Sequence, residues 1–261
     1  MILRRLTQSL KEQNWTAIWI EFILLVTGVF LGIQVSNWNA ERVAEDQSLV
    51  FTQRLRADLK IEAWNYEYMT RYYREVLANA EMALAEMEGQ TELPNERFLV
   101  AAYRATQDNS PNRRRATFDE LRATGNLVLI HDPTLLTAAS FVYAPNTVLD
   151  MFDPQKVNSR YRLEFRMRIP MAVQSSLAEH CGDRFVPVGS FKEIANSLDY
   201  PCVTGLKPQD IDNAVHVLLT NTDVLPLLRL RVADLKSIVF TVTDSNHDSR
   251  QSLKAVMDQR P

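Results

Sequence analysis

The most constraining feature of the sequence is an apolar stretch near its start, residues 17–35. Its nineteen residues are apolar apart from Glu21, Thr27, Gln34 and two glycines. At a rise of about 1.5 Å per residue a helix of this length reaches about 28 Å, close to the bilayer's hydrocarbon thickness of about 30 Å. Trp15 and Trp19 lie at one end of the stretch and Trp38 lies just after the other. Amphipathic rings of this kind prefer the headgroup level of a bilayer. We therefore predict a transmembrane helix over residues 15–38.

Glu21 is the main objection to a membrane span. An acidic residue at the bilayer centre costs about 2.5 to 3.5 kcal/mol, whereas the large aliphatic and Phe residues of the stretch contribute roughly −4 to −7 kcal/mol. Glu21 also lies near the end of the stretch, where its cost is smaller. A cleaved signal peptide is the alternative, but the apolar run is long for one and no small-x-small cleavage site follows it cleanly. We expect an uncleaved anchor in the lipid bilayer.

The charges on either side of the stretch predict its orientation. Basic residues precede it, and acidic residues dominate the segment directly after it. Because positive charge is retained in the cytoplasm, residues 1–14 are predicted to be a short cytoplasmic N-terminus. Residues 39–261 are then predicted to form an extracytoplasmic domain.

Four residues of the predicted span, Glu21, Leu25, Gly28 and Gly32, follow one another at spacings of 4, 3 and 4. This spacing places them on one face of a helix. Small residues four apart let two membrane helices approach closely, so the face suits a homodimer or a second membrane protein. The alternative is that the glycines have no partner, since glycine is common in membrane helices, and that the carboxylate of Glu21 reaches the headgroups.

Two sequence blocks resemble a bacterial family of uncharacterised single-pass membrane proteins. The first block is GVFLGIQVSNWN at residues 28–39, followed by Glu41 and Arg42. The second is TFDEL at residues 117–121, with Gly125-Asn126-Leu127, Ile130 and Asp132. The resemblance implies an inner-membrane anchor with a periplasmic domain. It supplies no catalytic residues, because the family has no assigned role.

The remainder of the chain is typical of an all-α protein. The whole chain has only seven glycines, which leaves few turns for a β-sandwich or barrel. Residues 41–88 contain neither Gly nor Pro and predict one long helix that ends at Gly89. Ten positions of this helix follow one another at alternating spacings of 4 and 3, and we call these ten positions the seam. We interpret the seam as the core-packing face of a coiled-coil-like helix. They are Leu55, Leu59, Glu62, Tyr66, Met69, Tyr73, Val76, Ala80, Ala83 and Met87.

Shorter helices are predicted to complete a bundle around this long helix. Thr117 and Glu120 have the spacing of a capping box, and Asp132 with Pro133 predicts a helix start. A helical region over residues 146–181 is predicted to break at Asp153-Pro154 and at Pro170. Further helices are predicted over residues 95–107 and 208–220. A last helix is predicted from about residue 223 to Met257, with a weak stretch at residues 241–246, and it is long enough to lie antiparallel to the long helix.

Cys181 directly precedes the irregular segment 182–205, and Cys202, the other cysteine of the chain, lies near the end of that segment. Two cysteines outside the cytoplasm usually pair, so we predict a disulfide that closes a loop of about twenty residues. The alternative is a metal site formed by His180 and the cysteines, but adjacent His and Cys lack the ligand spacing of a zinc site. We therefore expect no metal and no cofactor.

Net charge and motifs limit the possible functions. A net charge of −3 argues against nucleic acid as a partner. The run Arg113-Arg114-Arg115 suits either a solvated loop or contact with phospholipid headgroups or an acidic partner. Arginines at 160, 162, 166 and 168 suit surface ion pairs better than an anion site. The sequence has no Gly-rich phosphate loop, His-Glu-x-x-His motif or nucleophile elbow, so we predict no catalytic residues.

These observations predict a membrane-anchored periplasmic helical module with an interaction or sensory role rather than an enzyme. With so few residues inside the cytoplasm, a partner in the membrane or periplasm would have to carry any signal. An enzyme acting on cell-envelope material is one alternative, which a deep polar pocket would favour. A passive assembly factor for a membrane complex is the other, which a large exposed apolar patch would favour.

Overall fold

The computed structural model of the protein describes residues 15–145, 159–245 and 247–258. Among these residues every regular element is helical, which confirms the predicted all-α fold. The chain divides into two compact units, Met1–Thr52 and Gln53–Pro261. The predicted cytoplasmic segment 1–14 and the predicted break at Asp153-Pro154 lie outside the described residues.

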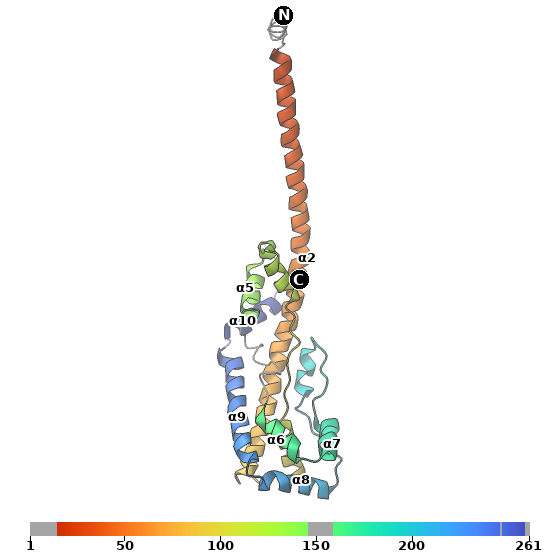
Figure 1. The fold of residues 1–261 in the computed structure, drawn as a ribbon, viewed down its shortest axis with the longest axis vertical. Coiled ribbons are helices and arrows are strands. Elements are labelled where there is room, and N and C mark those ends of the chain that lie inside the picture. The colour runs from red at the N-terminus through yellow and green to blue at the C-terminus, as the bar shows by residue number, and fades with distance from the viewer. Residues whose placement is uncertain (1–14, 146–158, 246, 259–261) are drawn as a thin grey trace, which may run out of the picture. The chain divides into compact units, whose positions relative to one another are not determined.

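Figure 1 shows the described helices in their order along the chain. The first, α2, spans Trp15–Met87 and contributes residues to both units. The other α-helices are α3 (Asn95–Arg104), α4 (Ala116–Ala123), α5 (Pro133–Val142), α6 (Arg160–Arg168), α7 (Met171–Cys181), α8 (Pro208–Thr220), α9 (Val224–Phe240) and α10 (His247–Asp258). Three short elements lie between them: the 3-10 helices η1 (Asn126–Leu129) and η3 (Phe191–Asn196), and the π-helix η4 (Thr241–Ser245).

The described part of the first unit is a single stretch of α2 that contains the predicted span. Its side chains from Trp19 onward through the apolar stretch are exposed; Leu24 and Leu25 each expose 66% of their surface. The most apolar window has a mean hydropathy of 1.8 and contributes nothing to a core. Among the described helices, α2 alone is long and apolar enough to cross a membrane. A possible single-pass anchor is therefore present where the sequence predicts one.

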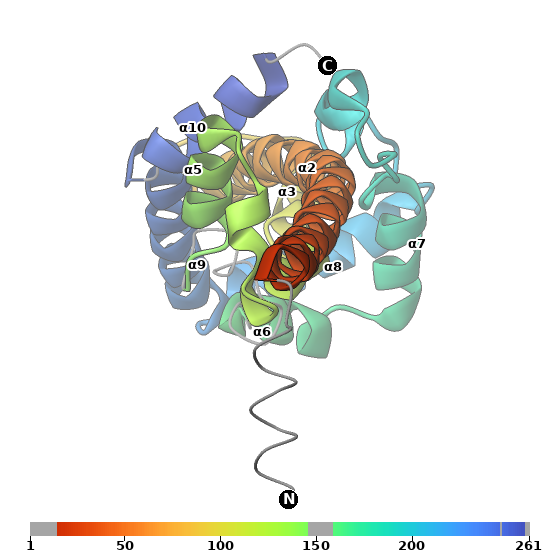
Figure 2. The same ribbon diagram turned by 90° about the horizontal axis from the view of Figure 1, so that it is seen from above.

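The core of the second unit forms on the seam of α2, as predicted. Nine of the ten seam side chains, from Leu55 to Ala83, are buried, and the last one, Met87, is half-buried. The shorter helices pack around this part of α2, with α9 on one side and α7 on the other (Figure 2). The Tyr and Met residues of the seam are therefore core residues.

Local chemistry determines where several helices begin and end. Gly89, in the left-handed conformation with φ 69°, follows the last turn of α2, and the Glu86 carboxylate accepts a hydrogen bond of 2.8 Å from the backbone N–H of Leu93. Asp132 caps α5, as predicted: its carboxylate accepts from the N–H groups of Thr134 and Leu135. The predicted break at Pro170 lies between α6 and α7.

The predicted capping box is wrong. Helix α4 begins at Ala116, so Thr117 lies inside the helix and is buried, and no side chain caps the helix start. Glu120, the other member of the predicted capping box, pairs with Arg54 instead, at 2.8 Å.

The predicted last helix is also interrupted. It is divided into α9 and α10 by the π-helix η4, and α10 packs mainly on α5. Two threonine hydroxyls in η4, those of Thr241 and Thr243, donate to carbonyls four residues earlier, and such bonds bend helices. The Tyr66 hydroxyl also donates to the Val242 carbonyl, which draws this turn onto α2.

The connection between α3 and α4 runs along α2 and is held by polar side chains of that helix. The Tyr73 hydroxyl donates to the Asn109 carbonyl at 2.9 Å, and the Asn109 amide donates to the Tyr68 hydroxyl at 2.9 Å. Further along, the Asn65 amide donates to the Asn112 carbonyl. Because buried backbone groups need partners, these bonds let an irregular segment pack against a core helix.

The polar seam residue Glu62 is fully buried and is paired with the first arginine of the Arg113–Arg115 run. Arg113 Nε lies 2.8 Å from a Glu62 carboxylate oxygen, and the Arg114 backbone N–H donates to the other oxygen. Burial raises the pKa of Glu62, and the Arg113 charge offsets part of this rise. Arg113 is thus an internal partner of α2, and the interpretation of the whole run as a solvated loop is wrong at this residue.

Replacing Arg113 by Met should leave Glu62 buried without a cation. Breaking such a pair costs about 3 to 5 kcal/mol, so the free energy of unfolding should fall by that order. The folded variant should hold a proton on Glu62 that the unfolded chain loses above its ordinary pKa, so the loss should be larger at pH 8 than at pH 5. Urea denaturation of the detergent-solubilised chain at both pH values measures this.

The double variant Glu62→Leu with Arg113→Met is the control, because it removes both charges. It should recover most of the lost stability, and without Glu62 it should lack the loss of stability between pH 5 and pH 8 that the single variant shows. An Arg113→Met deficit that is the same at pH 5 and pH 8 would contradict the role given to this pair.

Candidate functional site

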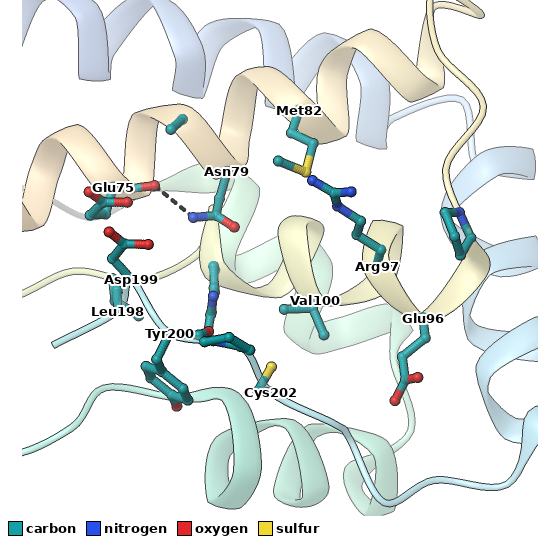
Figure 3. A pocket seen from close by; sticks show the side chains of 14 residues that line it. Glu75, Asn79, Met82, Glu96, Arg97, Val100, Leu198, Asp199, Tyr200 and Cys202 are labelled. Atoms are coloured by element: carbon teal, nitrogen blue, oxygen red, sulfur yellow. Dashed lines mark hydrogen bonds between the residues drawn. The ribbon is translucent and has the colours of Figure 1, made fainter. Parts of the chain in front are cut away.

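A half-open groove in the second unit is the strongest candidate for a functional site. It has a volume of about 570 Å³ and lies between α2, α3 and the segment 198–202 (Figure 3). All three of its walls belong to the same compact unit. It combines charged, polar and apolar side chains, as small-solute sites do.

The two helical walls come from consecutive elements that run in opposite directions. On α2, Glu75, Asn79 and Met82 follow at spacings of 4 and 3, so they form a stripe beside the seam. On α3, Arg97 and Arg104 are seven residues apart and lie on one face of that helix. Figure 3 shows Arg97 toward the Met82 end of the groove. Arg104 lies near the other end, where its charge acts on Glu75.

The third wall is held in place by a buried arginine. Arg104 exposes only 7% of its surface and its Nε donates to the Cys181 carbonyl at 3.2 Å. Its terminal nitrogen donates to the Tyr200 carbonyl at 3.0 Å, and its guanidinium lies 4.6 Å from the centre of the Tyr200 ring. The Tyr200 hydroxyl in turn donates to the Gly182 carbonyl at 2.6 Å. Arg104 therefore binds the end of α7 and the segment 198–202 to α3.

The predicted disulfide closes the same wall. Cys181 and Cys202 are bonded, with a distance of 5.4 Å between their Cα atoms. The disulfide joins the end of α7 to Cys202, the last residue of the third wall. This pairing uses both thiols, so the metal site considered for them with His180 does not form; the His180 ring instead contacts the Ser176 carbonyl. No cluster of three metal-ligating side chains occurs in the described part of the chain.

Two carboxylates face each other at one end of the groove. Figure 3 shows Glu75 on α2 and Asp199 on the opposite wall pointing toward one another. Within the described residues neither carboxylate has a hydrogen bond or an ion pair. Burial raises the pKa of Glu75, and repulsion from Asp199 raises it further, while the charges of Arg71 and Arg104 offset part of the rise. A cation placed between the two carboxylates would relieve this repulsion.

The other end of the groove is less acidic. Glu96 also lines the groove, but its carboxylate accepts hydrogen bonds from the Thr204 N–H and hydroxyl at 2.8 and 2.6 Å, which lowers the pKa of Glu96. The guanidinium of Arg97 is exposed and forms no ion pair with the described residues. The groove therefore has free negative charge at one end and free positive charge at the other.

The membrane-face residues named from the sequence are not part of this groove. Glu21, Leu25, Gly28 and Gly32 all lie on the exposed part of α2 in the first unit. A side chain added at Gly28 or Gly32 would meet nothing within 4 Å. This face is open, and what it packs against stays a prediction.

The arginine-rich segments named from the sequence are mostly engaged within the fold. Arg115 pairs with Asp119 at 2.9 Å, beside the half-buried Arg113. Arg162 pairs with Asp108 at 3.3 Å, and Arg168 pairs with Glu164 at 2.6 Å, as expected for ion pairs. These pairings use four of the seven arginines in the two segments for contacts within the domain.

The groove residues escaped the sequence analysis because each is ordinary in its local context. Glu75 and Asn79 look like solvent-facing residues of an amphipathic helix, and Asp199 lies in a segment without a motif. The cysteine pair was the only signal near the site, because it indicated that residues 181 and 202 meet. It did not indicate which helix they meet on.

Comparison with protein-family models, with curated proteins and with solved structures found no match to this chain. The groove must therefore be interpreted from its own geometry.

Replacing both Cys181 and Cys202 by Ser should destabilise the domain and loosen the third wall. A disulfide across 21 residues of sequence separation contributes about 3 kcal/mol in the chain-entropy model. Urea denaturation followed by tryptophan fluorescence should show a loss of that order. A reductant should lower the stability of the wild-type chain toward that of the variant and leave the variant unchanged; an unaltered midpoint in the variant would contradict the stabilising role.

Proposed function

We propose that this protein is a single-pass membrane protein whose extracytoplasmic helical domain binds a small solute in the groove of α2, α3 and segment 198–202. The observation that carries the proposal is the pair of facing, unpartnered carboxylates in that groove. Most charged side chains around it have partners, as Arg104 and Glu96 do. Glu75 is half-buried and Asp199 is exposed. Two unpartnered like charges that face each other across a groove repel, and their presence there favours a binding role.

Three observations support the membrane-anchored part of the proposal. The apolar stretch of α2 is exposed from Trp19 onward, which suits lipid as its surroundings. The charges before and after it favour an N-terminus inside and a domain outside the cytoplasm. The bonded cysteines suit an oxidising compartment such as the periplasm. The resemblance to a bacterial family of single-pass proteins agrees with this topology.

Signal transmission and self-association are further parts of the proposal. A domain of this kind acts as a sensory or interaction module if solute binding changes its contacts with a partner in the membrane or periplasm. The face formed by Glu21, Leu25, Gly28 and Gly32 is the proposed surface for a second copy or for such a membrane partner.

An enzyme acting on cell-envelope material is the second candidate. The carboxylate pair of Glu75 and Asp199 is the observation that favours it, because two carboxyl groups in a groove can act as acid and base. Conversion of a bound solute into products would identify an enzyme, whereas release of the unchanged solute would identify a binding module.

The anchor is tested by placing charges inside the proposed span. Leu24→Arg combined with Val29→Arg costs about 5 to 7 kcal/mol, which cancels the favourable insertion free energy of the stretch. The wild-type chain should stay in the membrane after an alkaline carbonate wash, and a phosphatase fused after Pro261 should be active. Both properties should be lost in the double-Arg variant and kept in a Leu24→Ile, Val29→Ile control. Release of the wild-type chain by the wash would contradict the anchor.

The groove is tested by filling it. Ala78 is exposed and lines the groove, so Ala78→Trp should block it without disturbing the core. Full-length protein isolated from its native membrane should carry a small solute that mass spectrometry detects after denaturation. Ala78→Trp should lose the solute, and Ala233→Trp, at an exposed alanine of α9, should keep it. Equal solute content in wild type and Ala78→Trp would refute binding in the groove.

A further inference from the structure

The chemistry of the groove specifies its solute more closely, on the premise that the proposed binding function holds. The acidic end presents the carboxylates of Glu75 and Asp199. The side-chain nitrogen of Asn79 donates to the Glu75 backbone carbonyl at 2.8 Å, and its oxygen points away from the two carboxylates (Figure 3). The two carboxylates offer acceptors and two negative charges, which match a primary ammonium group with its three donors and one positive charge.

Arg104 does not neutralise this end. Its charge offsets only part of the rise in the pKa of Glu75, and its hydrogen bonds in the described structure go to the carbonyls of Cys181 and Tyr200. Arg71 also acts on Glu75 through space, without a hydrogen bond to it in the described structure. The carboxylates at the acidic end therefore lack hydrogen-bond donors, and a ligand can supply these donors.

Arg97 defines the opposite end of the groove. Its side chain extends from α3 toward the Met82 side, away from Glu75 and Asp199 (Figure 3). An exposed guanidinium without an ion pair is suited to bind a carboxylate through two parallel hydrogen bonds. Between the two ends, Ala78, Met82 and Val100 line the groove with apolar surface.

The two helical walls, α2 and α3, give the same estimate of the distance between the acidic end and the Arg97 end of the groove. Glu75 and Met82 are seven residues apart on α2, which corresponds to about 10 Å along the helix axis. Arg97 and Arg104 are also seven residues apart on the antiparallel α3, so they span about 10 Å as well. An extended tripeptide places its two termini about 10 Å apart.

We propose that the groove binds a short zwitterionic solute of the size of a tripeptide, with its ammonium group between Glu75 and Asp199 and its carboxylate on Arg97. The apolar middle of the groove then contacts small side chains or methylene groups of the solute. The acceptor set and the free guanidinium select both charged ends together, so a solute that lacks either end binds more weakly.

The test uses the full-length chain in detergent and four probes with defined ends. Trialanine has both charged ends, N-acetyl-trialanine lacks the ammonium group, and trialanine amide lacks the carboxylate. The fourth probe, 8-aminooctanoate, has both ends on an alkyl chain and shows whether peptide groups are needed. Isothermal titration calorimetry measures binding, and the isotope-labelled methyl resonance of Met82 reports occupancy of the groove.

Trialanine should bind at least about tenfold more tightly than either blocked peptide, as expected for a lost charge-assisted hydrogen bond. Glu75→Gln should weaken trialanine by about tenfold and leave the binding of N-acetyl-trialanine unchanged. Arg97→Gln should weaken trialanine and leave the binding of trialanine amide unchanged. The matched controls Glu67→Gln and Arg122→Gln, at exposed positions outside the groove, should behave as wild type.

Two results would overturn the zwitterion inference. One is binding of N-acetyl-trialanine or trialanine amide within twofold of trialanine, and the other is no binding of either zwitterionic probe. If the native protein still carries a solute that Ala78→Trp excludes, the binding function stands and only the solute class is wrong. If no solute is lost in Ala78→Trp, the proposed function itself fails.

Discussion

The helical domain depends on the burial of one long face of α2. The seam residues from Leu55 to Ala83 supply a continuous apolar and aromatic surface that no single short helix can cover. The following helices are too short to be stable alone, and they gain stability by packing on that face and on one another. The groove is a product of the same arrangement, because α2 provides its longest wall with the stripe that lies beside the seam.

Charged residues inside the domain join the irregular segments to this helical frame. Glu62 binds the segment after α3 through Arg113, and Arg104 binds the segments around the disulfide. Arg231, which exposes 3% of its surface, does the same for the end of α3, where it bonds the Ala105 carbonyl and the Asp108 carboxylate. Buried charges of this kind are costly unless paired, so each of them restricts how its segment can pack. Against this background the unpartnered pair in the groove is the exception.

Features that depend on neighbouring residues were predicted well from the sequence. The end of α2 at Gly89, the Asp132 cap and the Pro170 break each follow from the chemistry of a few adjacent residues. The capping box failed because the N-cap of α4 is Arg115, two residues before Thr117. The last helix is interrupted within its predicted weak stretch, where Tyr66, which is far away in the sequence, binds the Val242 carbonyl. The groove was not predicted for the same reason, since Glu75 and Asp199 meet only in the folded domain.

The order of the groove walls along the chain has a consequence for biosynthesis. Ribosomal synthesis delivers α2 and α3 before the segment that ends at Cys202, and folding can begin while the rest of the chain is still being made. The helical hairpin thus exists before Tyr200 can stack on Arg104. The groove is therefore completed from its C-terminal wall: Glu75 gains Asp199 opposite it, and Glu96 gains Thr204, only when the segment around Cys202 packs against the two helices.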